Sequence, residues 1–182
     1  MIKSKSDLEK YQSMDMRFYR QQDVKTRRMC RLTQDPVYLI DKYVTYLRRE
    51  EYFYNTRKGK WGTMRYLAAF RKKNKLGNKL GFKIPKNCFG PGLTIYHHGE
   101  IIVNETARIG AFCTLHGSNC IGNNGIQDKS PVIGDKLDLG IGAKVIGDVH
   151  LGNSVRVGAN AVVISSFEQD GITLVGVPAV QK

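Results

Sequence analysis

Residues 133–168 read IGDKLDLGIGAKVIGDVHLGNSVRVGANAVVISSFE and repeat one pattern every six positions without interruption. The fifth position of each unit is apolar, and glycine follows the first position in four of the six units. The first position is always aliphatic: Ile133, Leu139, Val145, Leu151, Val157 and Val163. A period of six fits neither an amphipathic helix nor a half-buried strand. The stretch therefore predicts short strands joined by regularly spaced turns and stacked as a solenoid.

The same frame extends towards the N-terminus as far as residue 97. Ile121, Leu115, Ile109 and Val103 all fall in the first position. Residues 122–131 are rich in Gly, Asn, Asp and Ser, and Gln127 stands in a first position there, so we predict an excursion that leaves and rejoins the stack. His97 also falls in a first position, where an aliphatic side chain is expected. We assign residues 81–182 to the solenoid.

Residues 1–80 are predicted to form a helical region. Asp35 and Pro36 are typical of an N-cap followed by proline at the first helical position. A stripe of apolar side chains follows at helical spacing: Val37, Ile40, Val44 and Leu47. Residues 56–62 interrupt this pattern, and a second helix is predicted over residues 61–75. Gly77 and Gly81 are expected to end the helical region.

The net positive charge of the chain is confined to the N-terminal part. Residues 1–80 hold 21 Lys and Arg against 8 Asp and Glu, while residues 81–182 hold 8 of each. This asymmetry indicates a partner that is anionic, such as a membrane leaflet, a phosphorylated substrate or nucleic acid, or else a solvated basic surface. The second helix, with Trp61 near a lysine cluster, is either a cap on the open end of the solenoid or an interfacial membrane helix, and we favour the cap.

Composition excludes several classes. No run of 18 apolar residues is present and the first thirty residues are too polar for a signal peptide, so we expect a cytoplasmic protein, with peripheral contact at the inner membrane face as an option. The four cysteines show no metal-binding spacing, so we expect reduced thiols and no metal site.

Two further motifs resemble the hexapeptide-repeat acyltransferases, in particular their serine acetyltransferase-like group. Residues 90–104, GPGLTIYHHGEIIVN, resemble the active-site segment of this group, and residues 176–179, GVPA, resemble its C-terminal signature. The resemblance implies a mainly β protein with a left-handed parallel β-helix. It further implies a homotrimer with acetyl-CoA bound in grooves between neighbouring subunits, without a metal.

The resemblance also implies a histidine base. His97 matches the catalytic histidine of the group, and His98 is its rival. Imidazole suits the task because a hydroxyl needs a base that titrates near pH 7 within hydrogen-bond reach. His116 lies 19 residues after His97 and a coil of three hexapeptides takes 18, so we expect it one layer along on the same edge. Glu105 is the third catalytic candidate.

Three positions depart from the serine acetyltransferase pattern. Phe82 stands where the group has an orienting aspartate, Tyr96 replaces the aspartate before the histidine, and Lys129 with Ser130 replace an Arg-His pair. A carboxylate that orients His97 is therefore sought among Glu100, Glu105 and Asp128. We name four acceptor-binding candidates: Tyr96, His98, Asp128 and Lys129.

The family's acetyl-CoA contacts fall on five positions: Asn123, Ile141, Gly142, Arg156 and Ala159. Small residues there let an extended pantetheine lie along the backbone, and the planar guanidinium of Arg156 matches phosphate oxygens. From the resemblance and the three departures we predict an acetyl-CoA-dependent O-acetyltransferase acting on a sugar hydroxyl of a polysaccharide or glycolipid precursor. Two alternatives are a serine O-acetyltransferase of cysteine biosynthesis and a non-catalytic scaffold or nucleic-acid binder, although nucleic acid is disfavoured.

Overall fold

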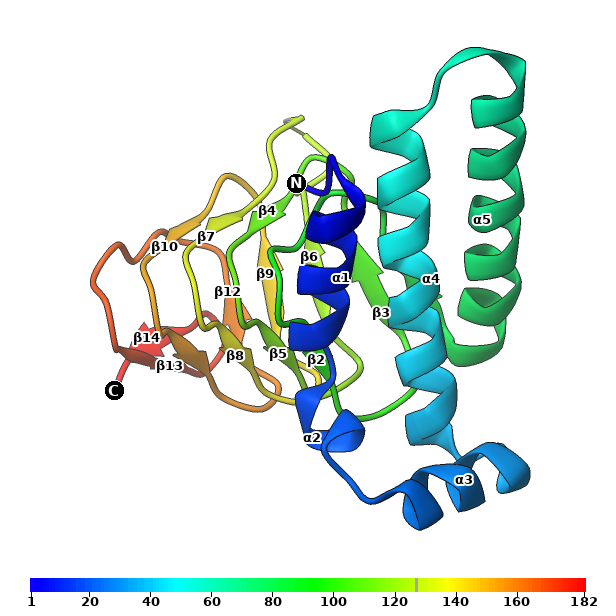
Figure 1. Cartoon of the computed structure of the whole chain (residues 1–182). Helices are drawn as coiled ribbons and strands as arrows, with labels where there is room; N and C mark the ends of the chain where they lie inside the picture. Colours follow the sequence, from blue (N-terminus) through cyan, green and yellow to red (C-terminus); the bar gives the residue numbers. More distant parts are fainter. Residues whose placement is uncertain (127) are drawn as a thin grey trace.

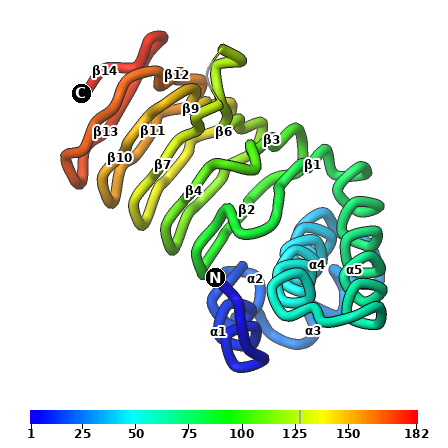
Figure 2. Tube along the Cα trace, turned by 90° about the horizontal axis from the view of Figure 1, so that it is seen from above, coloured from blue at the N-terminus to red at the C-terminus, as the bar shows by residue number. Residues whose placement is uncertain are grey.

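The computed structural model describes residues 1–126 and 128–182, in which a layer of helices is stacked against one end of a β-helix (Figure 1). Figure 2 shows the coils of the β-helix following one another away from the helices towards the C-terminus. The helices are α1 (Lys5–Met14), α2 (Arg17–Arg20), α3 (Val24–Thr33), α4 (Pro36–Thr56) and α5 (Gly59–Leu80). None of the helices among the described residues combines the length and apolarity that crossing a membrane requires.

Side-chain caps explain where two of these helices begin. The Asp35 side chain accepts a hydrogen bond from the Val37 N–H at 2.9 Å, and Pro36 is the first residue of α4, as predicted. At the start of α3, the Asp23 side chain accepts from the Thr26 N–H at 2.9 Å. The predicted helix over residues 61–75 is longer at both ends than expected, as α5.

Gly77 does not end the helical region; this prediction is wrong. Gly77 lies inside α5, where a Cβ atom would come 2.7 Å from the Phe82 carbonyl oxygen and 3.0 Å from the Tyr43 ring. Glycine is therefore required there for close packing rather than for a turn. The helix ends at Gly81, whose φ of 78° lies in the left-handed region that glycine adopts without strain.

The fourteen strands of the described residues form three sheets. The first contains β1 (Phe82–Lys83), β3 (Ile101–Val103), β6 (Cys120–Gly122), β9 (Lys144–Ile146) and β12 (Val162–Val163). The second contains β4 (Arg108–Ile109), β7 (Val132–Ile133) and β10 (His150–Leu151). The third contains β2 (Thr94–Ile95), β5 (Thr114–Leu115), β8 (Asp138–Leu139), β11 (Arg156–Val157), β13 (Thr173–Val175) and β14 (Val180–Gln181). All pairings are parallel except that of β13 with β14.

The strand register confirms the solenoid and the excursion. Ile102 pairs with Cys120, a step of 18 residues, whereas Cys120 pairs with Lys144, a step of 24. The coil that contains residues 122–131 therefore has six additional residues. Because this insertion equals one hexapeptide, the frame of apolar positions stays in phase across it. Gln127, which falls in a first position of that frame, lies outside the described residues.

The register also corrects the position of His97. Ile95 pairs with Leu115, a step of 20 residues, so the coil before His116 has two residues more than a regular coil. The inward position expected at residue 97 is taken by Ile95, which is fully buried. His97 is exposed in the turn that follows β2. The assignment of His97 to a first position of the frame is wrong because a two-residue insertion shifts the frame.

The first and fifth positions of the hexapeptides line one continuous core. Leu139, Val145 and Val157 are at most 1% exposed, and Leu80 and Ile84 belong to the same cluster. The core thus runs from the β-helix into the helices. The inner side of α5 covers the open end of the solenoid, which confirms the cap interpretation for that side of the helix.

Candidate functional site

One corner of the β-helix collects most of the predicted site residues. The turns after β2, β5, β8 and β11 lie one beyond another because these strands are in parallel register. Backbone hydrogen bonds join the turns: the Gly142 N–H donates to Gly117 O, and the Asn160 N–H donates to Ile141 O, both at 2.9 Å. The corner contains seven of the predicted residues: Tyr96, His97, His98, His116, Ile141, Gly142 and Ala159.

Three aromatic side chains gather at the first two turns of this corner. The Tyr96 ring lies 5.0 Å from the His116 ring and 6.5 Å from the His97 ring, measured between centroids. A Cβ atom at Gly117 would lie 3.3 Å from the Cβ of His97, so the two turns touch. His97 and His98 are exposed, and the Tyr96 ring is partly exposed at 40%. His97 and His116 therefore share one surface, as their spacing predicts.

His116 is the histidine that a carboxylate orients. Its Nε2 lies 2.8 Å from Oδ1 of Asp138 on the next coil, and Oδ2 of Asp138 lies 3.3 Å from Nε of Arg156 on the coil after that. Both members of the His116–Asp138 pair are more than one-third exposed, so a ligand can reach them. An imidazole held by a carboxylate is the arrangement that fixes a histidine tautomer for proton transfer.

The sequence interpretation did not find Asp138. Asp138 and Arg156 each stand directly before an aliphatic first position, so their side chains point out from the same sheet. Reading the outward positions of that sheet would have placed Asp138 beside Arg156, which was already a candidate for phosphate binding. To align these outward positions, the six-residue insertion has to be placed first.

The helical region also reaches this site. Phe18 of α2 packs against Tyr96 with 5.0 Å between ring centroids. The Asp15 carboxylate accepts hydrogen bonds from the N–H groups of Gly92 and Leu93, each at 2.9 Å, in the segment that leads into β2. No motif in residues 1–33 marked Phe18 or Asp15, because their partners lie about 77 residues away in the sequence.

Several predicted residues lie elsewhere in the chain. Glu105 follows β3, at the next corner, where it lines a groove with Lys83 and Lys86. Asn123 follows β6 at the start of the excursion, and Asp128 is exposed within it. None of the three candidate carboxylates, Glu100, Glu105 and Asp128, bonds to His97 in the described part of the chain. Which carboxylate, if any, orients His97 therefore stays open.

Lys129 is engaged by a neighbouring coil. Its Nζ lies 2.6 Å from Oδ2 of Asp148, and this hydrogen bond lowers the pKa of the Asp148 carboxyl below its ordinary value. His150 Nε2 approaches the other carboxylate oxygen at 3.6 Å. These contacts fix one end of the excursion to the coil beyond it. Among the described residues, no group of three or more His, Cys, Asp or Glu side chains has an arrangement that would hold a metal ion.

Known proteins with similar sequences are serine acetyltransferases. The enzyme of Synechococcus elongatus is 34% identical over 96 residues, which are 52% of this chain and 39% of that protein. The enzyme of Helicobacter pylori strain J99 is 38% identical over 97 residues, which are 52% of this chain and 56% of that protein. The chain thus spans about half the length of the curated relatives that it matches. No family model matches the chain.

Solved structures extend the likeness over both regions. The serine acetyltransferase of Brucella abortus gives a TM-score of 0.75 at 22% identity and covers 98% of this chain and 70% of that chain. The structure of the same enzyme in complex with coenzyme A gives a TM-score of 0.67 at 25% identity. It covers 81% of this chain and 58% of that chain. The predicted left-handed parallel β-helix with an N-terminal helical region is confirmed. Repeat, fold and relatives together make this chain similar to the serine acetyltransferase-like group of the hexapeptide-repeat acyltransferases.

Proposed function

We propose that this chain transfers an acetyl group from acetyl-CoA to a hydroxyl group, with His97 as the general base. The observation that carries the proposal is the corner at which His97, Tyr96 and the His116–Asp138 pair meet. An exposed imidazole beside a second, carboxylate-held imidazole supplies the proton acceptor that an unactivated hydroxyl needs.

In the proposed reaction, His97 removes the proton of the acceptor hydroxyl while the oxygen attacks the thioester carbonyl carbon. The tetrahedral intermediate then expels the CoA thiolate by breaking the carbon–sulfur bond, and the protonated imidazole returns its proton to that sulfur. His116, held by Asp138 at 2.8 Å, forms the wall of the acceptor site next to Tyr96. Backbone N–H groups of the turns are suited to the oxyanion.

Acetyl-CoA would bind along the later turns of the same corner, beyond those that carry the histidines. Ile141, Gly142 and Ala159 lie in successive turns, and two solved structures of serine acetyltransferases are complexes with CoA. Arg156 projects from β11 with a 70% exposed side chain, which leaves its guanidinium accessible to phosphate although Asp138 lies 3.3 Å away. Asn123 lies outside this corner and would contribute only from its place in the excursion.

L-Serine is the favoured acceptor, because the proteins with similar sequences are serine acetyltransferases. This favours the alternative over our first prediction of a sugar acceptor. A sugar hydroxyl remains the second candidate for one reason. Tyr96, a partly exposed neutral ring, stands beside His97 where serine acetyltransferases have an aspartate for the amino group of serine.

The acceptor is tested by measuring release of free CoA thiol from acetyl-CoA with the purified chain. L-Serine is compared with a panel of monosaccharides and nucleotide sugars at equal concentration. Turnover on L-serine that exceeds turnover on every sugar supports the first acceptor, and the reverse order supports the second. No thiol release above the uncatalysed rate with any hydroxyl acceptor contradicts the proposed function.

The base is tested by separate substitution of the two histidines. His97→Ala is expected to lower kcat roughly 100-fold to 10,000-fold, the usual contribution of a general base. Asp138→Asn is expected to cause a smaller loss, because it removes an orienting group and leaves the base. The matched control is His150→Ala, an exposed histidine outside the corner, which should retain full activity. If His97→Ala stays active while His116→Ala does not, then His116 is the base and our assignment is wrong.

A further inference from the structure

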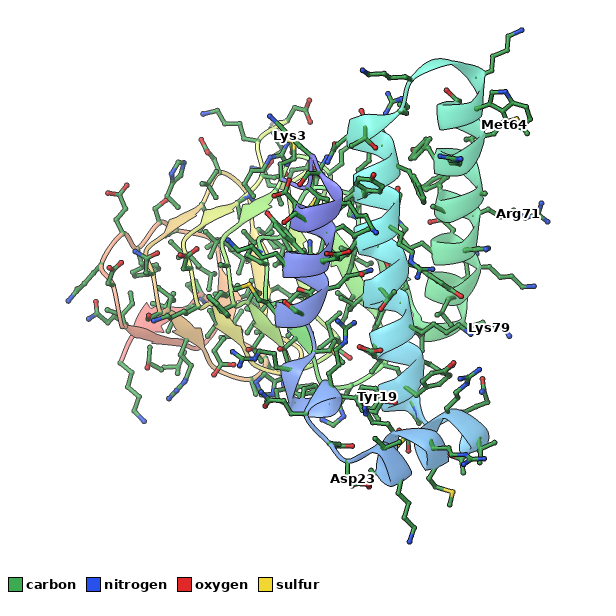
Figure 3. The ribbon with its side chains drawn as sticks, in the orientation of Figure 1. Lys3, Tyr19, Asp23, Met64, Arg71 and Lys79 are labelled. Carbon is green, nitrogen blue, oxygen red and sulfur yellow. The ribbon has the colours of Figure 1, made fainter. Side chains whose placement is uncertain are left out.

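The outer side of α5 carries an exposed face that the proposed acetyl transfer does not use. Its members recur at intervals of three or four residues and so lie on one side of the helix. In Figure 3, Met64, Arg71 and Lys79 point away from α4 along this side. We call this the α5 face and define it by Trp61, Met64, Arg65, Leu67, Arg71, Lys72, Lys75 and Lys79.

The N-terminal half of the α5 face is apolar. Trp61 is 78% exposed, Met64 58% and Leu67 52%. Isolated exposed apolar residues are common on soluble proteins, but here three large ones follow one another on two turns of a single helix. They stand next to the α4–α5 connection, at one end of the helical layer (Figure 1).

The C-terminal half of the same face is basic. Lys72, Lys75 and Lys79 of α5 and Lys42 of α4, together with Tyr46 and Leu76, line a groove with a volume of about 200 Å³ between the two helices. None of these four lysines forms an ion pair with a carboxylate in the described part of the chain. The groove therefore concentrates uncompensated ammonium groups.

No acidic residue balances this charge in α5 or in the sequence directly around it. α5 contains seven Lys and Arg residues and no Asp or Glu, and the whole segment 52–99 contains no Asp or Glu. The overall excess of basic residues in residues 1–80 is thus concentrated most strongly here. A face of this kind is electrostatically complementary to an anionic partner.

Anionic lipid fits the α5 face better than the other partners considered. A second copy would oppose lysines to lysines across a two-fold contact, which like-charge repulsion disfavours. Nucleic acid would neutralise the lysines, but Met64 and Leu67 offer nothing to phosphates or base edges. A membrane interface accepts both kinds of side chain, since Trp and Leu enter the acyl boundary while Lys binds anionic headgroups.

We propose that the α5 face binds the surface of an anionic membrane leaflet, with Trp61, Met64 and Leu67 inserted at the interface and the lysine groove on lipid phosphates. This inference does not depend on the proposed acetyl transfer. It places the protein next to a membrane through the outer side of α5, whereas the histidine corner belongs to the turns of the β-helix. Binding should be reversible and weaken with salt, because the electrostatic contribution is screened.

Trp61 is the only tryptophan of the chain, so its fluorescence reports on the α5 face directly. The full-length chain is mixed with vesicles of phosphatidylcholine alone or of phosphatidylcholine with phosphatidylserine. A blue shift of the emission with phosphatidylserine vesicles only, reversed by high salt, is expected. An unchanged spectrum, or an equal shift with both vesicle types, contradicts the proposal.

Substitutions separate the lysine groove from general positive charge. The triple variant Lys72→Gln, Lys75→Gln, Lys79→Gln is expected to weaken vesicle affinity roughly 100-fold, since each lysine near an anionic surface contributes about a factor of five. The control removes the same charge elsewhere, as Lys3→Gln, Lys10→Gln, Lys136→Gln, all exposed, and should bind nearly as well as the parent chain. Circular dichroism and thiol release, both expected to be unchanged, show that each variant folds.

Two further outcomes overturn the proposal. If the triple variant loses a higher oligomer in size-exclusion chromatography instead of vesicle binding, the face is an interface between copies. If the parent chain binds a short DNA duplex more tightly than phosphatidylserine vesicles, the face serves nucleic acid. If the parent chain binds phosphatidylserine vesicles but releases no thiol from acetyl-CoA, this inference stands and only the proposed function is contradicted.

Discussion

At the scale of single residues, one buried arginine connects the helical region to the segment that carries His97. Arg48 is fully buried, and its guanidinium contacts Asp15 at 2.9 Å, Glu51 at 3.0 Å and the carbonyl oxygens of Phe89 and Gly90. Burial alone would lower the pKa of Arg48, but the two carboxylates offset this and raise it. Because Asp15 also accepts from Gly92, the network fixes the backbone that leads into β2.

Arg48→Met is expected to destabilise the protein by about 3 to 5 kcal/mol, because it leaves two buried carboxylates without a cation. The free energy of unfolding is measured by urea titration. The neighbouring Arg49 is exposed, and Arg49→Met should change stability by no more than about 0.5 kcal/mol. Equal effects of the two substitutions would show that the Arg48 network contributes nothing specific.

At the scale of elements, the repeated glycines mark a corner where successive coils touch. A Cβ atom at Gly134 would lie 2.6 Å from Asn153 Oδ1 and 2.8 Å from Gly152 O. At the same corner, the Asn153 side chain accepts from the Asp135 N–H at 2.8 Å. The glycine after each aliphatic position thus leaves room for a side chain that caps the backbone of the preceding coil.

Gly134→Ala is expected to cost about 1 to 3 kcal/mol, because the added methyl group overlaps backbone atoms that cannot move aside. Thermal unfolding provides the measurement. Gly122→Ala serves as the control, since its nearest contact would be the Cys120 sulfur at 3.8 Å and its φ is not in the left-handed region. A Gly134→Ala protein that unfolds at the same temperature as the Gly122→Ala protein would contradict the close contact.

A buried ion pair joins α4 to α5. Lys73 Nζ lies 2.7 Å from Oε2 of Glu50 and 2.9 Å from the Ile84 carbonyl oxygen. Burial raises the pKa of Glu50 above its ordinary value of 4.5, although Lys73 pulls it down. Since the folded carboxyl then binds a proton more readily than the unfolded one, its contribution to stability is fully present below pH 4.5 and is lost as the pH rises through the raised pKa.

Lys73→Met is therefore expected to destabilise the protein by about 3 to 5 kcal/mol near neutral pH and by less below pH 4.5, where Glu50 is protonated and needs no cation. Urea unfolding of the variant and its parent at several pH values gives the difference. Lys72→Met, at the exposed neighbouring position, is the control and should show no such pH dependence. If the loss of stability in Lys73→Met became larger on acidification, the assigned ion pair between Lys73 and Glu50 would be refuted.

At the scale of the whole molecule, two exposed isoleucines at one sheet favour an interface between protomers there. In the sheet of β1, β3, β6, β9 and β12, Ile102 is 37% exposed, and Ile164, directly after β12, is 57% exposed. This sheet adjoins the histidine corner, so a neighbouring protomer packed there would lie against the site. The homotrimer implied by the family resemblance remains a prediction.

Light scattering is expected to give three times the mass of one chain. Ile102→Asp combined with Ile164→Asp should convert this species to monomer and abolish thiol release, because a carboxylate is costly to bury in an apolar interface. Val132→Asp, a similarly exposed position at 45% on another sheet, should leave the mass unchanged. A parent chain of monomeric mass would refute the prediction.

The hexapeptide period determined the β-helix by itself, because an aliphatic residue at every sixth position can be buried only if each coil repeats the last. The N-cap at Asp35 and the closeness of His97 to His116 are local or periodic properties and were predictable for the same reason. Register was not. Two additional residues before His116 moved His97 out of the core, and only strand pairing revealed them.

The contacts that build the site were decided by tertiary structure. Asp138 reaches His116 across 22 residues, Phe18 reaches Tyr96 from a helix without a motif, and Asp15 holds Gly92 across 77. Such contacts depend on insertion lengths and on how the helices dock, neither of which has a periodic signal. The repeating pattern alone therefore determined the scaffold, whereas the fold decided which side chains meet on it.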